Sequence, residues 1–143
     1  MNSVLLDTCA FVWLLQGDER LGDDAQAIIE DAGVRKLLSP VSYWEVAAKS
    51  SLPKYKGCEI LLKDHYKEAI SDLIAEYDIE ILHFSLEHTV RLYEMEYFTE
   101  HKDPFDRILV AKALVESASL ISSDGKLYYY GFDEQFKNVW VMV

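Results

Sequence analysis

The chain has 143 residues, half of them apolar, so one compact domain over residues 1–143 with its own hydrophobic core is expected. Its two cysteines form no metal-binding pair, and its start lacks a signal-peptide pattern, which together predict a cytoplasmic protein. No apolar run approaches the roughly 20 residues that cross a bilayer, which excludes a membrane span. The formal net charge of -11 argues against a broadly basic surface for nucleic acid. A local basic segment remains, because residues 46–57 carry Lys49, Lys54 and Lys56 and no carboxylate.

Short apolar runs alternate with segments of helical spacing along the chain. The runs predict five strands, at Ser3–Leu6, Lys36–Ser39, Ile79–Phe84, Ser119–Ser122 and Val139–Val143. The segments between them predict helices at Phe11–Leu15, Ala25–Ile29, Val46–Lys49, Ile60–Ala75, Leu86–Met95 and Phe105–Val115. This alternation predicts an α/β fold with a central parallel sheet of about five strands flanked by helices. Such sheets bind ligands at the carboxyl ends of their strands.

Two acidic residues follow predicted strands. Asp7 comes directly after the run VLL and precedes Thr8, a position that also suits a helix cap. Asp124 closes the segment SLISSD and is followed by glycine, a pair that is itself a turn signal. Each residue taken alone therefore has a structural explanation.

Two further acidic residues lie near predicted helix starts. Glu45 stands three residues after Ser42, which is the spacing of a capping box. In the segment HKDPFDR, Asp103 suits an N-cap, Pro104 the first helical position and Asp106 the third, where an acid interacts favourably with the helix dipole. Capping alone explains each of these residues as well.

The joint pattern of the four acids points to a metal site. All four fall on the same predicted rim of the sheet, and unpaired carboxylates about 4 Å apart repel one another by about 4 kcal/mol at an effective dielectric of about 20. A divalent cation relieves that repulsion, and oxygen ligands favour Mg²⁺ or Mn²⁺. The histidines have no zinc-binding spacing and are expected to be structural or solvated: His65, His83, His88 and His101.

The chemistry that such a site permits is phosphodiester hydrolysis by metal-activated water. No G-x-S-x-G, Walker A or G-x-G-x-x-G motif is present, so acyl transfer, P-loop hydrolysis and dinucleotide binding have no support in the sequence.

Four segments together resemble the PIN-domain nucleases of VapBC-type toxin-antitoxin modules. They are LLDTCAFVWLLQGDERL, SPVSYWEVAAKS, HKDPFDRILVAKAL and LISSDGKLYYYGF, and they span nearly the whole chain. The resemblance implies a PIN-like α/β/α fold and an endoribonuclease that uses Mg²⁺ or Mn²⁺ and inhibits translation. It also implies a homodimer that is silenced by a VapB-like antitoxin.

The resemblance assigns roles to individual positions. The acidic quartet maps onto Asp7, Glu45, Asp106 and Asp124, with supporting roles for Thr8, Asp103 and Ser122. Lys49 and Arg107 match recurring basic positions, which either contact substrate phosphate or pair with neighbouring acids. Lys112 stands where the subfamily often has Gln.

Two other functions compete with the nuclease. One is a receiver-like phosphoryl-transfer domain, in which a strand-end aspartate accepts phosphate and Lys126 pairs with it. The other is a PIN-like binding module without catalysis, in which the acids serve as caps. Four aromatic residues either line grooves for an antitoxin segment or pack in the core: Trp13, Trp44, Tyr55 and Tyr93.

Overall fold

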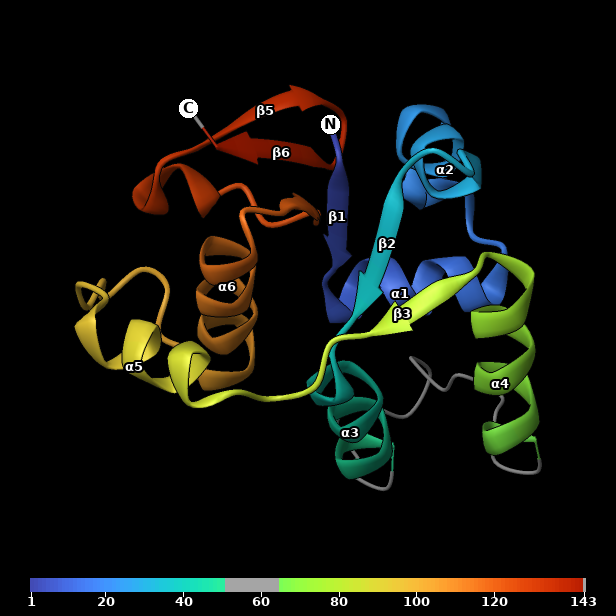
Figure 1. The fold of residues 1–143 in the computed structure, drawn as a ribbon, viewed down its shortest axis with the longest axis horizontal. Coiled ribbons are helices and arrows are strands. Elements are labelled where there is room, and N and C mark those ends of the chain that lie inside the picture. The colour runs from blue at the N-terminus through green and yellow to red at the C-terminus, as the bar shows by residue number, and fades with distance from the viewer. Residues whose placement is uncertain (51–64, 143) are drawn as a thin grey trace.

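The computed structural model describes residues 1–50 and 65–142 (Figure 1). Its strands are β1 (Ser3–Leu6), β2 (Arg35–Leu38), β3 (Ile79–Ile81), β4 (Ser119–Ile121), β5 (Phe132–Phe136) and β6 (Val139–Met142). Its α-helices are α1 (Thr8–Gln16), α2 (Asp23–Glu30), α3 (Pro40–Lys49), α4 (Tyr66–Glu76), α5 (Leu86–Glu94) and α6 (Pro104–Glu116). The described residues also form two short 3-10 helices, η1 (Glu19–Leu21) and η3 (Leu127–Tyr130). Within these ranges, no helix is long and apolar enough to span a membrane.

The strands form one mixed sheet in the order β3-β2-β1-β4-β6-β5. The first four strands are parallel, as predicted, whereas β6 pairs antiparallel with β4 and β5 pairs antiparallel with β6. The five predicted strands are confirmed, but the sheet has a sixth, β5, that the sequence did not reveal. Only Phe132 of the segment FDEQF is buried, so this edge strand lacks the apolar run on which the prediction relied.

Several predicted bounds differ from the observed ones. Strand β3 ends at Ile81 rather than Phe84, because the chain leaves the sheet there and exposes His83 and Phe84 to solvent. The predicted helix Ile60–Ala75 corresponds to α4, which begins at Tyr66, and the part of the prediction over residues 60–64 lies outside the described residues.

Alternate residues of the strands pack into two cores, one on each face of the sheet. Val4, Leu6 and Leu38 contribute to the core beneath α1, α2 and α4, whereas Leu5 and Leu37 pack against α6 on the other face. Helices thus cover both faces, with α5 lying outside α6 (Figure 1). Strands buried on both faces read as continuous apolar runs, which is why the sequence identified them.

The parallel strands place a topological switch between β1 and β4. The chain passes from β1 to β2 on one side, and β4 returns on the other side of β1. Just beyond both strands, the amide of Asp7 donates to the carbonyl of Ile121 at 3.0 Å. Crevices at such switch points, outside the carboxyl ends of the strands, are where open α/β sheets bind ligands.

Helix α3 begins earlier than predicted, and this corrects the expected capping box. Ser39 is the N-cap, its Oγ accepts the amide of Val41, and Pro40 is the first helical residue. Ser42 and Glu45 therefore lie inside the helix and do not cap its start. Proline suits the first turn because it has no amide hydrogen to leave unpaired.

Lys112 holds three elements together from the centre of α6. Its side chain is fully buried, and Nζ donates to Ser39 Oγ at 2.7 Å and to the Leu82 carbonyl at 2.5 Å. Nζ also lies 4.3 Å from the ring centroid of Phe84. Burial lowers the pKa of Lys112 to about 8. The cation therefore fixes the residue that caps α3 and the chain that leaves β3.

Replacing Lys112 with alanine is expected to reduce the free energy of unfolding by about 2–4 kcal/mol. The change removes the side-chain donor to the buried Leu82 carbonyl, removes one of the two donors to Ser39 Oγ, and opens a cavity. Urea denaturation measures the effect, with Lys102→Ala, at an exposed position, as the matched control. A loss below about 0.5 kcal/mol, equal to the range for surface substitutions, would show that the Lys112 contacts do not support the fold.

Candidate active site

Asp7 lies directly after β1 and caps helix α1. Its Oδ1 accepts the amide of Ala10 at 2.8 Å, so the predicted capping role is confirmed. Burial raises the pKa of Asp7 to about 7, a rise that the charges of Asp106 and Asp124 increase, while hydrogen bonds from Ser122 and Ala10 oppose it. The carboxyl group therefore resists ionisation in the folded protein, and a positive charge beside it would reverse that preference.

Asp106 lies in the first turn of α6. Asp103 is the N-cap of this helix, its Oδ1 accepts the amide of Phe105 at 2.8 Å, and Pro104 is the first helical residue, all as predicted. Burial raises the pKa of Asp106 to about 6, and the charges of Asp103 and Glu45 add to the increase. Like Asp7, Asp106 is thus a carboxyl group whose ionised form is disfavoured by its surroundings.

Asp124 lies in the loop after β4, and several contacts fix it. Oδ1 accepts the amide of Lys126 at 2.9 Å, Oδ2 lies 2.6 Å from Nε2 of His101, and its own amide donates to Ser122 Oγ at 3.0 Å. The hydrogen bond from His101 is the main reason that the pKa of Asp124 is lowered. Asp124 is therefore ionised beside two acids that resist ionisation.

Glu45 lies on the inner face of α3, with 7% of its surface exposed. Oε2 is paired with Lys49 Nζ at 2.5 Å, whereas the buried Oε1 has no hydrogen-bond partner among the residues that the structure describes. A buried carboxylate oxygen without a hydrogen-bond donor is costly in free energy. The charge of Glu45 acts on Asp106 and raises the pKa of that residue.

A small pocket brings three of the four predicted acids together. Asp7, Asp106 and Asp124 line it with His101 and Ser122, above an apolar floor of Leu109, Val110, Leu120 and Leu127. Glu45 is not among the lining residues, although its charge reaches Asp106. The structure therefore brings together Asp7 after β1, Asp106 in α6 and Asp124 in the loop after β4. Glu45, on α3, lies outside the pocket lining.

His101 is the residue of this group that the sequence reasoning missed. Ligand atoms of His101, Asp106 and Asp124 lie within 4.8 Å of one another, and His101 is only 5% exposed. The residue was expected to be structural or solvated because the histidines have no zinc-binding spacing. The available signal was its place in HKDPFDR, two residues before the helix cap Asp103 and five before Asp106.

The remaining predicted residues lie around the pocket in different environments. Thr8 Oγ1 donates to Ser42 Oγ at 3.3 Å and so links the start of α1 to α3. Lys49 pairs with Glu45, and its Nζ lies 5.2 Å from the ring centroid of Phe105. Arg107 points away from the acids, as described below.

Comparisons with known proteins agree with this architecture. A family model described as the PIN domain matches residues 4–133. The crystal structure of VapBC2 from Rickettsia felis bound to a DNA fragment from the promoter has a similar fold, with a TM-score of 0.62 and 16% identity over 88% of this chain and 91% of that chain. No curated protein matches the sequence. The mixed α/β/α sheet is a PIN fold, and the chain belongs to the PIN domain family.

Proposed function

We propose that this protein is a metal-dependent endoribonuclease and the toxin of a VapBC-type toxin-antitoxin module, acting in the cytoplasm as one domain. It hydrolyses RNA phosphodiester bonds at the acidic site of Asp7, Glu45, Asp106 and Asp124 and thereby inhibits translation. The observation that carries the proposal is the convergence of Asp7, Asp106 and Asp124 in one pocket at the carboxyl edge of a PIN-family sheet. Family membership favours a nuclease over the receiver-like alternative.

The residues fit a divalent cation. Burial raises the pKa values of Asp7 and Asp106, and the buried Oε1 of Glu45 has no hydrogen-bond partner within residues 1–50 and 65–142. Among these residues, the site therefore has more carboxylate than its positive charges balance. Carboxylate oxygens are ligands that Mg²⁺ and Mn²⁺ prefer, and the four acids would hold such an ion. When bound, the ion supplies an activated water and neutralises charge on the phosphate and the leaving oxygen.

The chain's own residues prepare the site for that ion. The Ala10 amide and Ser122 hold Asp7, and the Lys126 amide holds Asp124. The apolar floor of the pocket limits water around the carboxylates, which strengthens their interaction with a cation. Lys49, 26% exposed beside Glu45, is the candidate for a contact with substrate phosphate.

The proposed partner is a VapB-like antitoxin that binds the nuclease, itself a homodimer, and covers the site. The similar crystal structure, which contains VapBC2 with DNA, supports this pairing. Trp44, 58% exposed, packs against Phe105 with ring centroids 5.0 Å apart, so an aromatic pair lies next to Glu45 and Asp106 in sequence. Tyr93 is 92% exposed on α5, whereas Trp13 packs against the core. Tyr55 lies outside the described residues.

Purified protein free of antitoxin is expected to cut total RNA into discrete products with Mg²⁺ or Mn²⁺ and not with EDTA. Asp106→Asn should reduce the cleavage rate by about 100-fold or more, because metal-assisted charge stabilisation supplies several kcal/mol and about 1.4 kcal/mol changes a rate tenfold. Gel analysis of timed digests measures this, with Asp72→Asn, exposed on α4, as the matched control.

Two results of that experiment would contradict the nuclease. One is intact RNA after incubation with folded protein that binds Mn²⁺, which would favour a binding module. The other is cleavage by Asp106→Asn at the rate of the wild type.

Asp7→Asn is expected to abolish cleavage and to stabilise the metal-free fold in a pH-dependent manner. The pKa of Asp7 is raised to about 7 from 3.8, so as pH rises between these values the unfolded chain loses a proton that the folded protein keeps, and the free energy of unfolding falls. Asparagine avoids this cost and still caps α1. The gain should be near zero at pH 4 and about 2–4 kcal/mol at pH 8.

Chemical denaturation in EDTA at both pH values measures the gain, with Asp72→Asn as the control expected to show none. If Asp7→Asn destabilised the protein equally at pH 4 and pH 8, Asp7 would act only as a helix cap. It would not be a carboxyl group whose ionisation destabilises the fold.

A further inference from the structure

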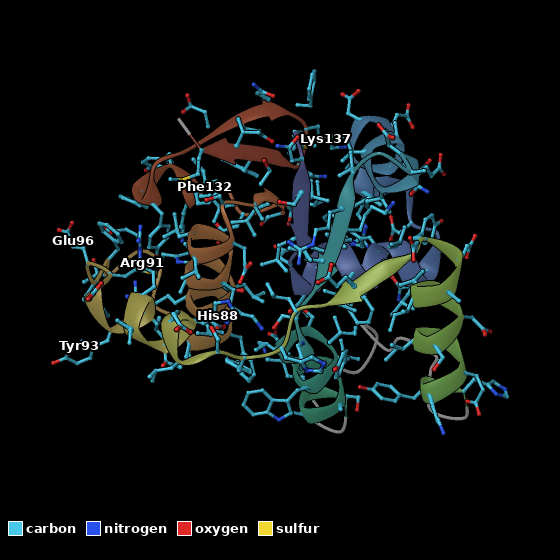
Figure 2. The ribbon with its side chains drawn as sticks, viewed as in Figure 1. His88, Arg91, Tyr93, Glu96, Phe132 and Lys137 are labelled. Atoms are coloured by element: carbon cyan, nitrogen blue, oxygen red, sulfur yellow. The ribbon has the colours of Figure 1, made fainter. Side chains whose placement is uncertain are left out.

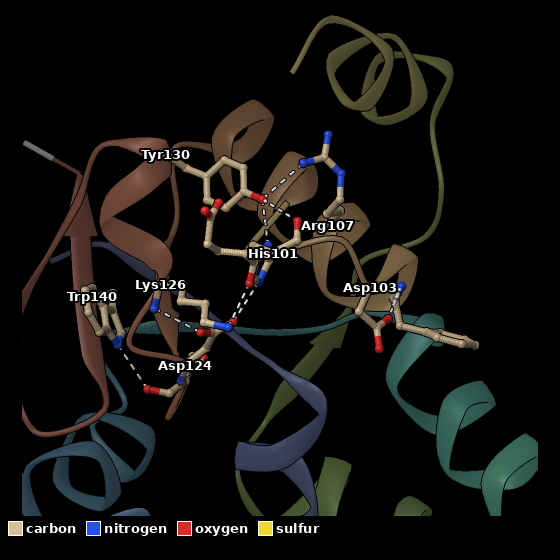
Figure 3. A network of polar contacts seen from close by, with 10 residues as sticks. His101, Asp103, Arg107, Asp124, Lys126, Tyr130 and Trp140 are labelled. Carbon is tan, nitrogen blue, oxygen red and sulfur yellow. Dashed lines mark hydrogen bonds and ion pairs between the residues drawn. The ribbon is translucent and has the colours of Figure 1, made fainter. Parts of the chain in front are cut away.

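A chain of polar contacts leads from the buried side of α6 to the acid Asp124 (Figure 3). Nη1 of Arg107 donates to the Tyr130 hydroxyl at 3.1 Å, and that hydroxyl lies 2.6 Å from Nδ1 of His101. Nε2 on the opposite side of the imidazole ring lies 2.6 Å from Asp124 Oδ2. The three side chains behind Asp124 come from α6, from η3 and from the segment before α6.

Arg107 and His101 are buried and Tyr130 between them is half-buried, so packing leaves these side chains little freedom to reorient. Arg107 is 9% exposed and His101 is 5% exposed. Nη1 of Arg107 has a second acceptor in the Glu96 carbonyl at 3.1 Å. The ring of Tyr130 packs edge-on against Phe98, with centroids 5.2 Å apart, and at 72° to the ring of His101. Arg107 is therefore anchored inside the protein and does not face the pocket that would receive phosphate.

The directions of the hydrogen bonds at the two ends of the chain follow from the chemistry of the groups. A guanidinium only donates, so the Tyr130 oxygen accepts from Arg107 and its single proton is available for Nδ1 of a neutral imidazole. The single N–H proton of the neutral ring is then on Nε2, which donates to Asp124. A protonated imidazole also donates from Nε2, and an unprotonated nitrogen would not lie 2.6 Å from a carboxylate oxygen.

We propose that His101 is a positioning residue of the site: held from behind by Tyr130 and Arg107, it fixes the Asp124 carboxylate by donating from Nε2, so that Asp124 is ready to bind the cation. This inference rests on the proposed metal-dependent function. The amide of Lys126 holds Oδ1 of Asp124 while His101 holds Oδ2, so the carboxylate is constrained at both oxygens. Hydrogen bonds to a metal-binding carboxylate typically contribute 10–100-fold to metal affinity or activity.

Four variants test the chain of contacts. His101→Leu removes the donor to Asp124, and His101→Gln offers an amide donor in its place. Tyr130→Phe removes only the hydroxyl that contacts Nδ1. Tyr129→Phe is the matched control, because Tyr129 also stacks on Phe98 but has no hydrogen bond to His101 among the described contacts. Circular dichroism establishes that each variant is folded.

The main readout is Mn²⁺ affinity by calorimetry, which does not depend on RNA cleavage. His101→Leu is expected to weaken Mn²⁺ binding by about 10–100-fold and Tyr130→Phe by about 3–10-fold, with His101→Gln near the wild type and Tyr129→Phe unchanged. Saturating Mn²⁺ should restore most of the RNA cleavage of His101→Leu, because the residue acts on cation binding. Electron spin-echo spectra of the Mn²⁺-loaded wild type should show no coupling to an imidazole nitrogen.

The contrary outcomes separate this inference from the proposed function. Wild-type protein that binds no Mn²⁺ would overturn both. Wild-type binding that His101→Leu and Tyr130→Phe leave unchanged would overturn only the role of His101. An imidazole-nitrogen coupling that His101→Gln abolishes would make His101 a direct metal ligand and would also overturn the positioning role.

Discussion

The structure depends on the confinement of several carboxyl groups at the carboxyl edge of the parallel strands β1 and β4. Burial disfavours the ionised carboxyl groups and the neighbouring like charges repel one another, and the raised pKa values of Asp7 and Asp106 reflect both costs. A fold that keeps such a site must hold its acids by contacts that do not neutralise them. The site thus lowers the free energy of unfolding of the metal-free protein and suits the binding of a cation.

The protein meets this constraint with contacts that already belong to its secondary structure. Asp7 caps α1 and Asp103 caps α6, so the same turns that start two helices also direct acids toward the pocket. The buried Lys112 fixes the cap of α3, the helix that carries Glu45. Figure 2 shows α5, with His88 and the exposed Tyr93, on the outside of α6 and away from the sheet. Helix capping and the site are therefore complementary roles of the same residues, not alternatives.

Much of this arrangement was predictable from the sequence. The apolar runs located β1, β2 and β4 because both faces of these strands are buried, and HKDPFDR located the start of α6 because it contains a helix cap followed by proline. The edge strand β5 was not predictable from periodicity, because it buries only Phe132.

One error within the site was local, and the others arose from contacts that are distant in sequence. Ser42 and Glu45 have the spacing of a capping box, but Ser39 caps the helix one turn earlier. Arg107 follows Asp106 directly, yet it points to Tyr130, 23 residues away. The same tertiary contact brings His101 to Asp124, which no spacing rule for histidine metal sites reveals.

The convergence of the acids on a cation is tested most directly by the anomalous scattering of a crystal of this protein grown with Mn²⁺. A single strong peak is expected in the pocket, within coordination distance of oxygens of Asp7, Asp106 and Asp124 and on the side of the pocket facing Glu45. Well-ordered crystals with no peak there, or with Mn²⁺ bound only elsewhere, would contradict the claim that these acids converge to hold a metal ion.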